Sequence, residues 1–205
     1  MTPIEPLFSM NPDGWCREIA RAPCTNFDER PQDAEVSLLV IHNISLPPGQ
    51  FGGDYIEALF ANTLDCDAHP YFEKLRGLKV SSHFLVRRDG RALQFVATSQ
   101  RAWHAGASQF EGRERCNDFS IGIELEGSDD QTYSDAQYKT LASLTHALAS
   151  HHSLSHIAGH EHIAPGRKTD PGPFFDWQRY RADFVAIEKK SASDMKSKRS
   201  LYFPD

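Results

Sequence analysis

The stretch SLLVIHNIS, residues 37–45, places four consecutive apolar residues directly before His42 and Asn43. A short apolar run of this kind is typical of a buried strand. His42 interrupts the run, and a buried imidazole needs a polar partner. Two interpretations follow: a core histidine bonded to a backbone carbonyl, which is the commoner case, or a metal ligand that projects from the end of the strand.

The neighbouring segments predict further strands and a short helix. Residues 54–62 have the pattern of a short helix, and residues 81–88 that of a strand. In RRDGRALQFVA, residues 87–97, the pair Asp89-Gly90 lies between apolar alternations and predicts a hairpin. SIGIELEG, residues 120–127, alternates apolar side chains with Gly122, Glu124 and Glu126. This alternation predicts a strand with one core face and both carboxylates on the other face.

The second half of the chain predicts helices that cover this sheet. Ser134 and Gln137 form a capping box, and apolar residues follow them at helical spacing. A strand near residues 156–163 and a last helix from about residue 175 to 187 complete the pattern. We therefore expect a single α/β domain with a mixed central sheet flanked by helices. The pattern does not give the order of the strands.

Composition narrows the possible classes of function. The 205 residues are 40% hydrophobic and 24% charged, which fits one compact domain with a full core. A formal net charge of -6 has the wrong sign for a general nucleic-acid binder. Apolar runs such as residues 38–41 are far shorter than the roughly 18 residues of a membrane span. We expect neither nucleic acid nor a membrane as a partner.

The two ends of the sequence and its cysteines give expectations about cellular location and domain boundaries. The first twenty residues lack the basic start and apolar run of a secretory signal, so we expect a cytoplasmic protein. The four cysteines show no zinc-type CxxC spacing, and we expect free thiols. Residues 188–199 are polar and lysine-rich, so we expect a domain over residues 1–187 and a mobile tail over residues 188–205.

A second histidine cluster lies in GHEHIAPGRKTDPGP, residues 159–173. His160 ends a strand-like segment, as His42 does, and Asp170 follows ten positions later in a proline-rich loop. Two imidazoles and one carboxylate suit zinc with an open fourth position. In an extended segment His162 would point to the same face as His160, so spacing does not choose between them. The seven other histidines are expected to have surface, capping or core roles.

Two further groups fit a hydrolytic site. Glu124 and Glu126 are equivalent on sequence grounds, and either could be a general base or a solvated strand residue. Lys168 lies two residues before Asp170, from where it could reach an oxyanion, although most lysines in such loops are surface residues. Together these groups indicate metal-assisted attack of water on an amide or ester.

Several longer motifs, in this order, resemble the AmpD family of cytosolic amidases. They are LLVIHNISLPPGQFGG (38–53), HPYF (69–72), RAWHAG (101–106), GRERCNDFSIGIELEG (112–127) and GRKTDPGPFFDW (166–177). The resemblance covers about residues 12–185, and it is specific because several long motifs match in order. It implies the fold of peptidoglycan recognition proteins and cleavage of the N-acetylmuramyl-L-alanine amide bond, preferably in 1,6-anhydro-muropeptides from cell-wall recycling.

The resemblance also implies roles for individual residues. The zinc ligands match His42, His160 and Asp170; the catalytic carboxylate matches Glu124 and the basic residue matches Lys168. It further implies a substrate cleft along the following residues: Asn43, Tyr71, Trp103, Arg115 and Arg167. The histidine at position 162 and the lysine-rich tail depart from the family pattern.

Two other hypotheses belong to different classes. A non-catalytic muropeptide sensor would be marked by loss of a ligand or of the acid, and every matching position retains a suitable side chain. A periplasmic amidase acting on the wall polymer would need an export signal. The expectation is therefore a monomeric cytoplasmic zinc amidase whose partner is a muropeptide.

Overall fold

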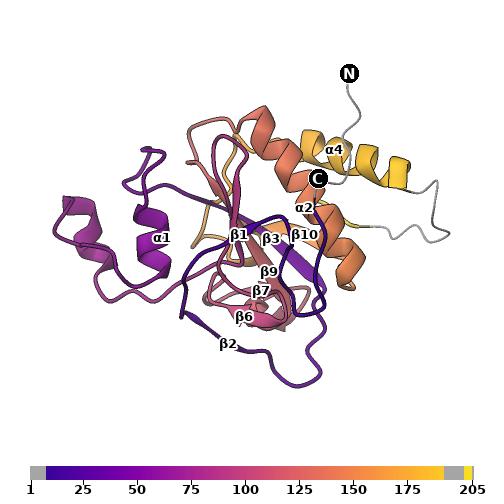
Figure 1. The fold of residues 1–205 in the computed structure, drawn as a ribbon, viewed down its shortest axis with the longest axis horizontal. Coiled ribbons are helices and arrows are strands. Elements are labelled where there is room, and N and C mark those ends of the chain that lie inside the picture. Colours follow the sequence, from indigo (N-terminus) through magenta and orange to yellow (C-terminus); the bar gives the residue numbers. More distant parts are fainter. Residues whose placement is uncertain (1–7, 192–200, 205) are drawn as a thin grey trace.

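The computed structural model describes residues 8–191 and 201–204, and a six-stranded sheet lies at its centre (Figure 1). The order of its strands is β1 (Ala20–Arg21), β5 (Ala92–Gln94), β4 (Phe84–Val86), β9 (Ser120–Glu126), β3 (Leu38–Ile44) and β10 (His156–Gly159). β4 and β5 are antiparallel, and the other neighbouring pairs are parallel. The predicted mixed sheet is confirmed, and β3, which contains most of the segment SLLVIHNIS, lies between β9 and β10.

Shorter elements surround this sheet. Two antiparallel pairs are β2 (Phe27–Glu29) with β6 (Gln100–Ala102) and β7 (Gln109–Phe110) with β8 (Arg113–Glu114). The helices are α1 (Tyr55–Phe60), α2 (Asp135–His151), α3 (His160–Ile163) and α4 (Trp177–Ser191), with 3-10 turns η1 (Pro70–Leu75) and η2 (Cys116–Asp118). The predicted hairpin at Asp89-Gly90 is confirmed as β4–β5, although β4 is shorter than the eight residues expected.

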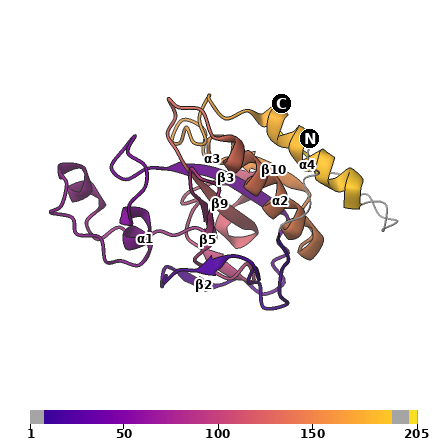
Figure 2. The same cartoon turned by 45° about the horizontal axis from the view of Figure 1, so that its top comes forward.

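Helix α2 begins at the predicted capping box. The Ser134 hydroxyl accepts a hydrogen bond from the Gln137 amide at 3.1 Å, and the Gln137 side chain accepts one from the Ser134 amide at 3.1 Å. Because these bonds satisfy amides that have no partner inside the helix, they fix its first turn. Helices α2 and α4 pack together on one side of the sheet (Figure 2). Their core cluster with the strands includes Leu39, Ile41, Ile121, Ile123, Leu141, Leu144 and Tyr180.

The opposite face of the sheet is also covered. Glu124 and Glu126 share one face of β9, as predicted, but all seven residues of the strand are buried, so both faces are covered where the alternation predicted one core face. A second cluster around Phe60, Phe72 and Phe95 packs Leu85 against α1 and η1. A third cluster around Val40 and Phe119 packs beside β10. The cover is incomplete near the carboxyl ends of β3 and β9, where His42, Glu124 and residues of the second cluster line a cleft. Parallel-sheet proteins commonly bind ligands at such ends.

The C-terminal boundary differs from the expected one. Helix α4 continues through residue 188 to Ser191, and Glu188 bonds His146 of α2. Residues 192–200 of the predicted tail lie outside the described residues. Leu201 is buried in the core cluster, and the Tyr202 ring stacks on His156. The domain therefore includes parts of the segment that polarity alone assigned to a tail.

The state of the cysteines agrees with the expectation from their spacing. All four cysteines are free thiols. None of the described helices has the length and hydropathy that a membrane crossing requires.

Replacing Ser134 by alanine tests the role of the capping box. We expect Ser134→Ala to lower the free energy of unfolding by about 1 kcal/mol, because the Gln137 amide loses its side-chain acceptor and the Arg88 carbonyl loses a donor. Urea denaturation followed by circular dichroism measures it. Ser153→Ala, at an exposed position after α2, is the control and should leave stability unchanged.

Candidate metal centre

The register of three parallel strands gathers the central residues of the site. β3 pairs His42 with Glu124 of β9, so the two side chains stand side by side on one face of the sheet. β10 pairs its last residue, Gly159, with Ile41, and the chain then continues directly into His160. The loop after α3 returns Asp170 to the same edge.

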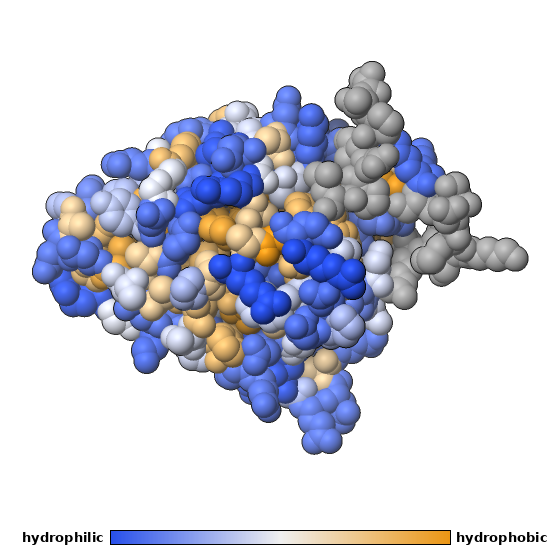
Figure 3. All heavy atoms as spheres, viewed as in Figure 1, coloured by the Kyte–Doolittle hydropathy of each residue, from blue (hydrophilic) through white to orange (hydrophobic). Residues whose placement is uncertain are grey.

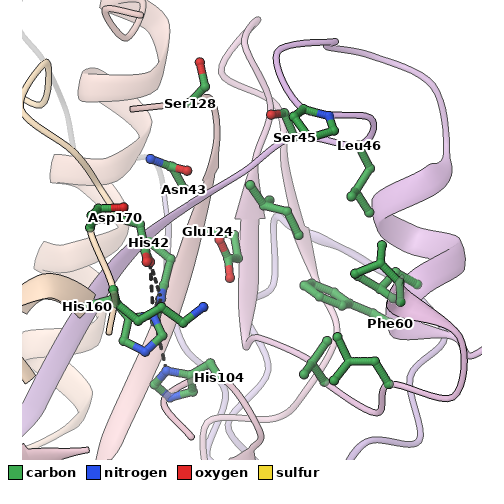
Figure 4. A pocket seen from close by; sticks show the side chains of 18 of the residues that line it. His42, Asn43, Ser45, Leu46, Phe60, His104, Glu124, Ser128, His160 and Asp170 are labelled. Atoms are coloured by element: carbon green, nitrogen blue, oxygen red, sulfur yellow. Dashed lines mark hydrogen bonds and ion pairs between the residues drawn. The ribbon is translucent and has the colours of Figure 1, made fainter. Parts of the chain in front are cut away.

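His42, His160 and Asp170 converge on one point (Figure 4). The two histidine Nδ1 atoms are 3.0 Å apart, and Asp170 Oδ2 lies 3.0 Å from Nδ1 of His42 and 3.1 Å from Nδ1 of His160. Around a tetrahedral metal with ligand bonds of about 2.0 Å, neighbouring ligand atoms are roughly 3.3 Å apart. The three atoms therefore fit one face of such a coordination sphere and leave the fourth position open.

The surroundings of His42 and Asp170 favour the protonation states that metal ligands need. Burial lowers the pKa of His42 to about 4, against the opposing effect of Asp170. Burial would raise the pKa of Asp170, but hydrogen bonds to His160 and His42 outweigh it and keep that pKa well below its usual range. A neutral imidazole and an ionised carboxylate are the forms that bind metals.

His162 does not join the cluster, and the reason is local structure. The predicted strand over residues 156–163 ends at Gly159, and residues 160–163 form a turn of helix, so positions 160 and 162 do not share a face. His162 Nδ1 accepts a hydrogen bond from the Gly159 amide at 2.8 Å, and its ring lies against Trp177. His162 thus caps the turn that presents His160.

The second ring nitrogen of His42 and of His160 has a buried partner. Nε2 of His160 lies 3.1 Å from the carbonyl oxygen of Ala105, and Nε2 of His42 lies 2.9 Å from Nδ1 of His104. Sequence reasoning missed His104, because an isolated histidine gives no ligand-like spacing. Its position within RAWHAG was the available signal.

A polar clamp holds the loop that carries Asp170. Asn43 donates hydrogen bonds to Asp129 at 2.7 Å and to the carbonyl oxygen of Pro171 at 3.0 Å. Thr169 also donates to Asp129, and Tyr133 donates to the same Pro171 carbonyl at 2.6 Å. Asn43, for which the family resemblance implied a place along the substrate cleft, lines the cleft and also holds the residue that follows Asp170.

The structure separates the two carboxylates that the sequence left equivalent. Glu126 pairs with Arg87 at 2.7 Å and accepts hydrogen bonds from the amides of Gly52 and Arg88. Glu124 lines the cleft, and its buried Oε2 atom has no hydrogen-bond partner among the described residues. Burial, together with the charge of Asp170, raises the Glu124 pKa well above its usual value, while the charge of Lys168 opposes the shift.

These residues open into a cleft of about 490 Å³. One wall is polar and includes His42, Glu124, His160, Arg167, Lys168 and Asp170. The facing wall is largely apolar and includes Leu46, Leu59, Phe60, Tyr71, Leu75 and Trp103. The close-up shows Glu124 between the cluster of His42, His160 and Asp170 and the apolar side chains around Phe60 (Figure 4). Apolar surface gathers over the middle of the face seen in the space-filling view, framed by hydrophilic side chains (Figure 3).

Four of the five expected substrate-binding residues line this cleft, and one does not. Besides Asn43, Tyr71 stacks under Lys74 and Trp103 donates to Asp28. Arg167 donates to the carbonyl oxygens of Ala105 and Ala107. Arg115 is outside the cleft lining: its side chain is 70% exposed, pairs with Asp118 and borders a separate hollow beside Gln109.

Comparison with known proteins identifies the family. The family model described as N-acetylmuramoyl-L-alanine amidase matches residues 32–173. The 1,6-anhydro-N-acetylmuramyl-L-alanine amidase AmpD of Escherichia coli is 56% identical over 180 residues, which cover 87% of this chain and 97% of that protein. The chain belongs to the AmpD family of N-acetylmuramoyl-L-alanine amidases.

Solved structures extend this family assignment. A crystal structure of a selenomethionine AmpD derivative matches with a TM-score of 0.83 and 56% identity, covering 85% of this chain and 98% of that one. The amidase AmiD of E. coli in complex with anhydro-N-acetylmuramic acid-L-Ala-D-gamma-Glu-L-Lys matches with a TM-score of 0.55 and 28% identity, covering 86% of this chain and 65% of that one. A peptidoglycan recognition protein ectodomain complex, at 16% identity, a TM-score of 0.52 and coverage of 77% of this chain and 92% of that one, shares the fold alone.

The geometry predicts different results for the two neighbouring histidines of this AmpD-family chain. We expect His160→Ala to lose bound divalent metal, because it removes one of three ligand atoms. His162→Ala should retain most of the metal and lose some thermal stability, because it removes only the cap of α3 and the contact with Trp177. Metal content by plasma mass spectrometry and melting by calorimetry measure both. Equal metal loss in the two variants would contradict the assignment of His160.

Proposed function

We propose that this chain is a zinc hydrolase that cleaves the amide bond between 1,6-anhydro-N-acetylmuramic acid and L-alanine in muropeptides. The observation that carries the proposal is the buried, unpartnered oxygen of Glu124 beside three convergent ligand atoms. The names of the relatives support the substrate, since they are 1,6-anhydro-N-acetylmuramyl-L-alanine amidases. The cytoplasmic location and the monomeric state stay predictions.

His42, His160 and Asp170 would hold the zinc ion, and their donor set is that of catalytic rather than structural zinc sites. When bound, zinc supplies a Lewis acid that polarises an amide carbonyl, lowers the pKa of water toward about 7 and favours the ionised form of the neighbouring Glu124.

Glu124 is the group that moves the proton. Its carboxylate accepts a proton from the water that attacks the lactyl carbonyl carbon, and a carbon–oxygen bond forms. The same carboxyl group then donates that proton to the alanine nitrogen as the carbon–nitrogen bond breaks. The products are a muramyl carboxylic acid, which keeps the second proton of the water, and a free amine. Burial raises the pKa of Glu124, which suits this exchange because it makes the carboxylate a stronger acceptor for the proton of the water.

Lys168 and the apolar wall complete the site. Lys168 lines the cleft on the polar side, where its ammonium group stabilises the negative charge that develops on the carbonyl oxygen in the transition state. Tyr71, Trp103 and the leucine side chains of the facing wall offer apolar surface to the sugar ring and the peptide stem. Positioning by these contacts keeps the amide bond next to Glu124.

Exchange of Glu124 for glutamine tests the mechanism. We expect Glu124→Gln to keep zinc and muropeptide binding but to lose at least about a hundredfold in kcat, because an amide cannot accept the proton of the attacking water. Mass spectrometry of anhydro-muropeptide incubated with the zinc-loaded protein measures the rate.

The matched control is Glu126→Gln, two residues along the same strand. It should retain kcat within a few fold and unfold at lower temperature, because Glu126 pairs with buried Arg87 and does not line the cleft. An inactive Glu126→Gln beside an active Glu124→Gln would reverse the assignment. A parent protein that binds muropeptide without cleaving it would favour the sensor hypothesis.

Substrate preference follows from the same proposal. We expect anhydro-muropeptide to be cleaved much faster per bond than intact wall polymer, because the relatives that match over most of their length are named for the anhydro substrate. Product release from both substrates is measured under equal zinc loading. Equal rates per bond would count against a recycling function and for an amidase of the polymer.

A further inference from the structure

His104 is a buried group that the proposed reaction does not use. It is 8% exposed, and its ring lies edge-on to His42 at a centroid distance of 5.0 Å and to His83 at 5.7 Å. In the close-up it lies beside the ligand histidines and on the far side of His42 from Asp170 (Figure 4). Its position raises the question of what the second imidazole does for the first.

A chain of three hydrogen bonds runs from the ligand to the backbone. His42 Nε2 lies 2.9 Å from His104 Nδ1, and His104 Nε2 lies 3.2 Å from the hydroxyl oxygen of Ser120. The Ser120 hydroxyl in turn lies 2.6 Å from the carbonyl oxygen of Cys116. All three side chains are buried, so no bulk water competes for these bonds.

The Cys116 carbonyl oxygen fixes the direction of all three hydrogen bonds. A carbonyl oxygen only accepts, so the single hydroxyl proton of Ser120 points to Cys116. The Ser120 oxygen must then accept from His104, which places the proton of that imidazole on Nε2 and leaves a lone pair on Nδ1. His104 Nδ1 therefore accepts from His42 Nε2, and the lone pair of His42 is left on Nδ1, the atom that faces His160 and Asp170.

We infer that His104 is a positioning residue that, through Ser120, selects the His42 tautomer able to bind the metal. The inference rests on the proposed function, because it assumes that His42 is a metal ligand. Metal-bound histidines commonly donate their other ring nitrogen to a fixed acceptor, which sets both tautomer and ring orientation. In this chain the acceptor is a second histidine, whose own tautomer is set in turn by a serine.

The surrounding structure keeps His104 in place. Gly122 lies beneath its ring, and a Cβ atom there would come within 2.6 Å of the His104 Cγ atom, so β9 admits the ring only because it carries glycine at this point. Asn117 accepts hydrogen bonds from the amides of His104 at 3.1 Å and of Ala105 at 2.8 Å. This anchor serves both ligands, because the Ala105 carbonyl accepts from Nε2 of His160.

The tautomers can be read directly in the unmodified protein. Nitrogen-15 NMR of protein labelled on histidine distinguishes a proton on Nδ1 from a proton on Nε2. In the zinc-loaded protein we expect both His42 and His104 to carry their ring proton on Nε2. A proton on Nδ1 of His104 would overturn the inference, and this readout depends neither on activity nor on a substitution.

Substitutions test the consequence for metal affinity. We expect His104→Leu to weaken zinc binding ten- to a hundredfold in competition with a chromophoric chelator, the range typical of groups behind a metal ligand. His104→Asn should bind zinc within about threefold of the parent, because the asparagine oxygen can accept from His42 near the position of Nδ1. The visible spectrum of the cobalt-substituted protein should change in His104→Leu and return in His104→Asn.

Ser120→Ala and Ser82→Ala form a matched pair of buried serines. Ser120→Ala should weaken zinc binding severalfold, because His104 is then free to take either tautomer. Ser82 is also buried but takes no part in the hydrogen bonds from His42 to Cys116, so Ser82→Ala should leave zinc affinity unchanged. This pair decides the question if His104→Leu fails to fold.

Equal zinc affinity in the parent, His104→Leu and Ser120→Ala would overturn the inference, as would an equal loss in His104→Leu and His104→Asn with both variants folded. A parent protein that binds no zinc is a different result, since it contradicts the proposed function itself.

Discussion

The pairing of β3 between β9 and β10 is the constraint on which the rest of the site depends. The ladder that sets Ile41 beside Ile123 under α2 also sets His42 beside Glu124 on the other face, because side chains alternate along both strands. A slip of one residue would turn His42 into the helix-covered core and Ile41 into the cleft. The same strand register therefore determines both the packing of the core and the geometry of the site.

Burial of the polar side chains of the site costs free energy, and hydrogen bonds to defined partners offset this cost. Three histidines and two carboxylates lie at the carboxyl ends of the strands with little access to water, where an unpaired polar group is expensive. The protein meets this cost by ending its hydrogen-bond chains on main-chain carbonyls, Ala105 for His160 and Cys116 for His42 through His104. A carbonyl has one hydrogen-bonding role, so each chain has one direction.

The sequence predicted the parts of this arrangement that depend on local pattern. The buried strand with His42, the hairpin at Asp89-Gly90 and the capping box at Ser134 follow from spacing and turn chemistry, and the structure has them. Spacing did not show that the chain turns into a helix at His160, because four residues are too few for periodicity to distinguish strand from helix. It also did not single out His104, whose partners are distant in sequence.

Glu124 and Glu126 lie on the same strand but have different surroundings. They share a residue type and a face of β9, and they differ in what the neighbouring elements bring to them. Arg87, held between Glu57 and Glu126, neutralises Glu126 and ties β9 to α1, which carries part of the apolar wall. An arginine beside Glu124 would favour the charged form of that carboxylate. Without one, burial and the charge of Asp170 raise the Glu124 pKa. A cation held by His42, His160 and Asp170 would shift it back toward the charged form, as the proposed proton transfer requires.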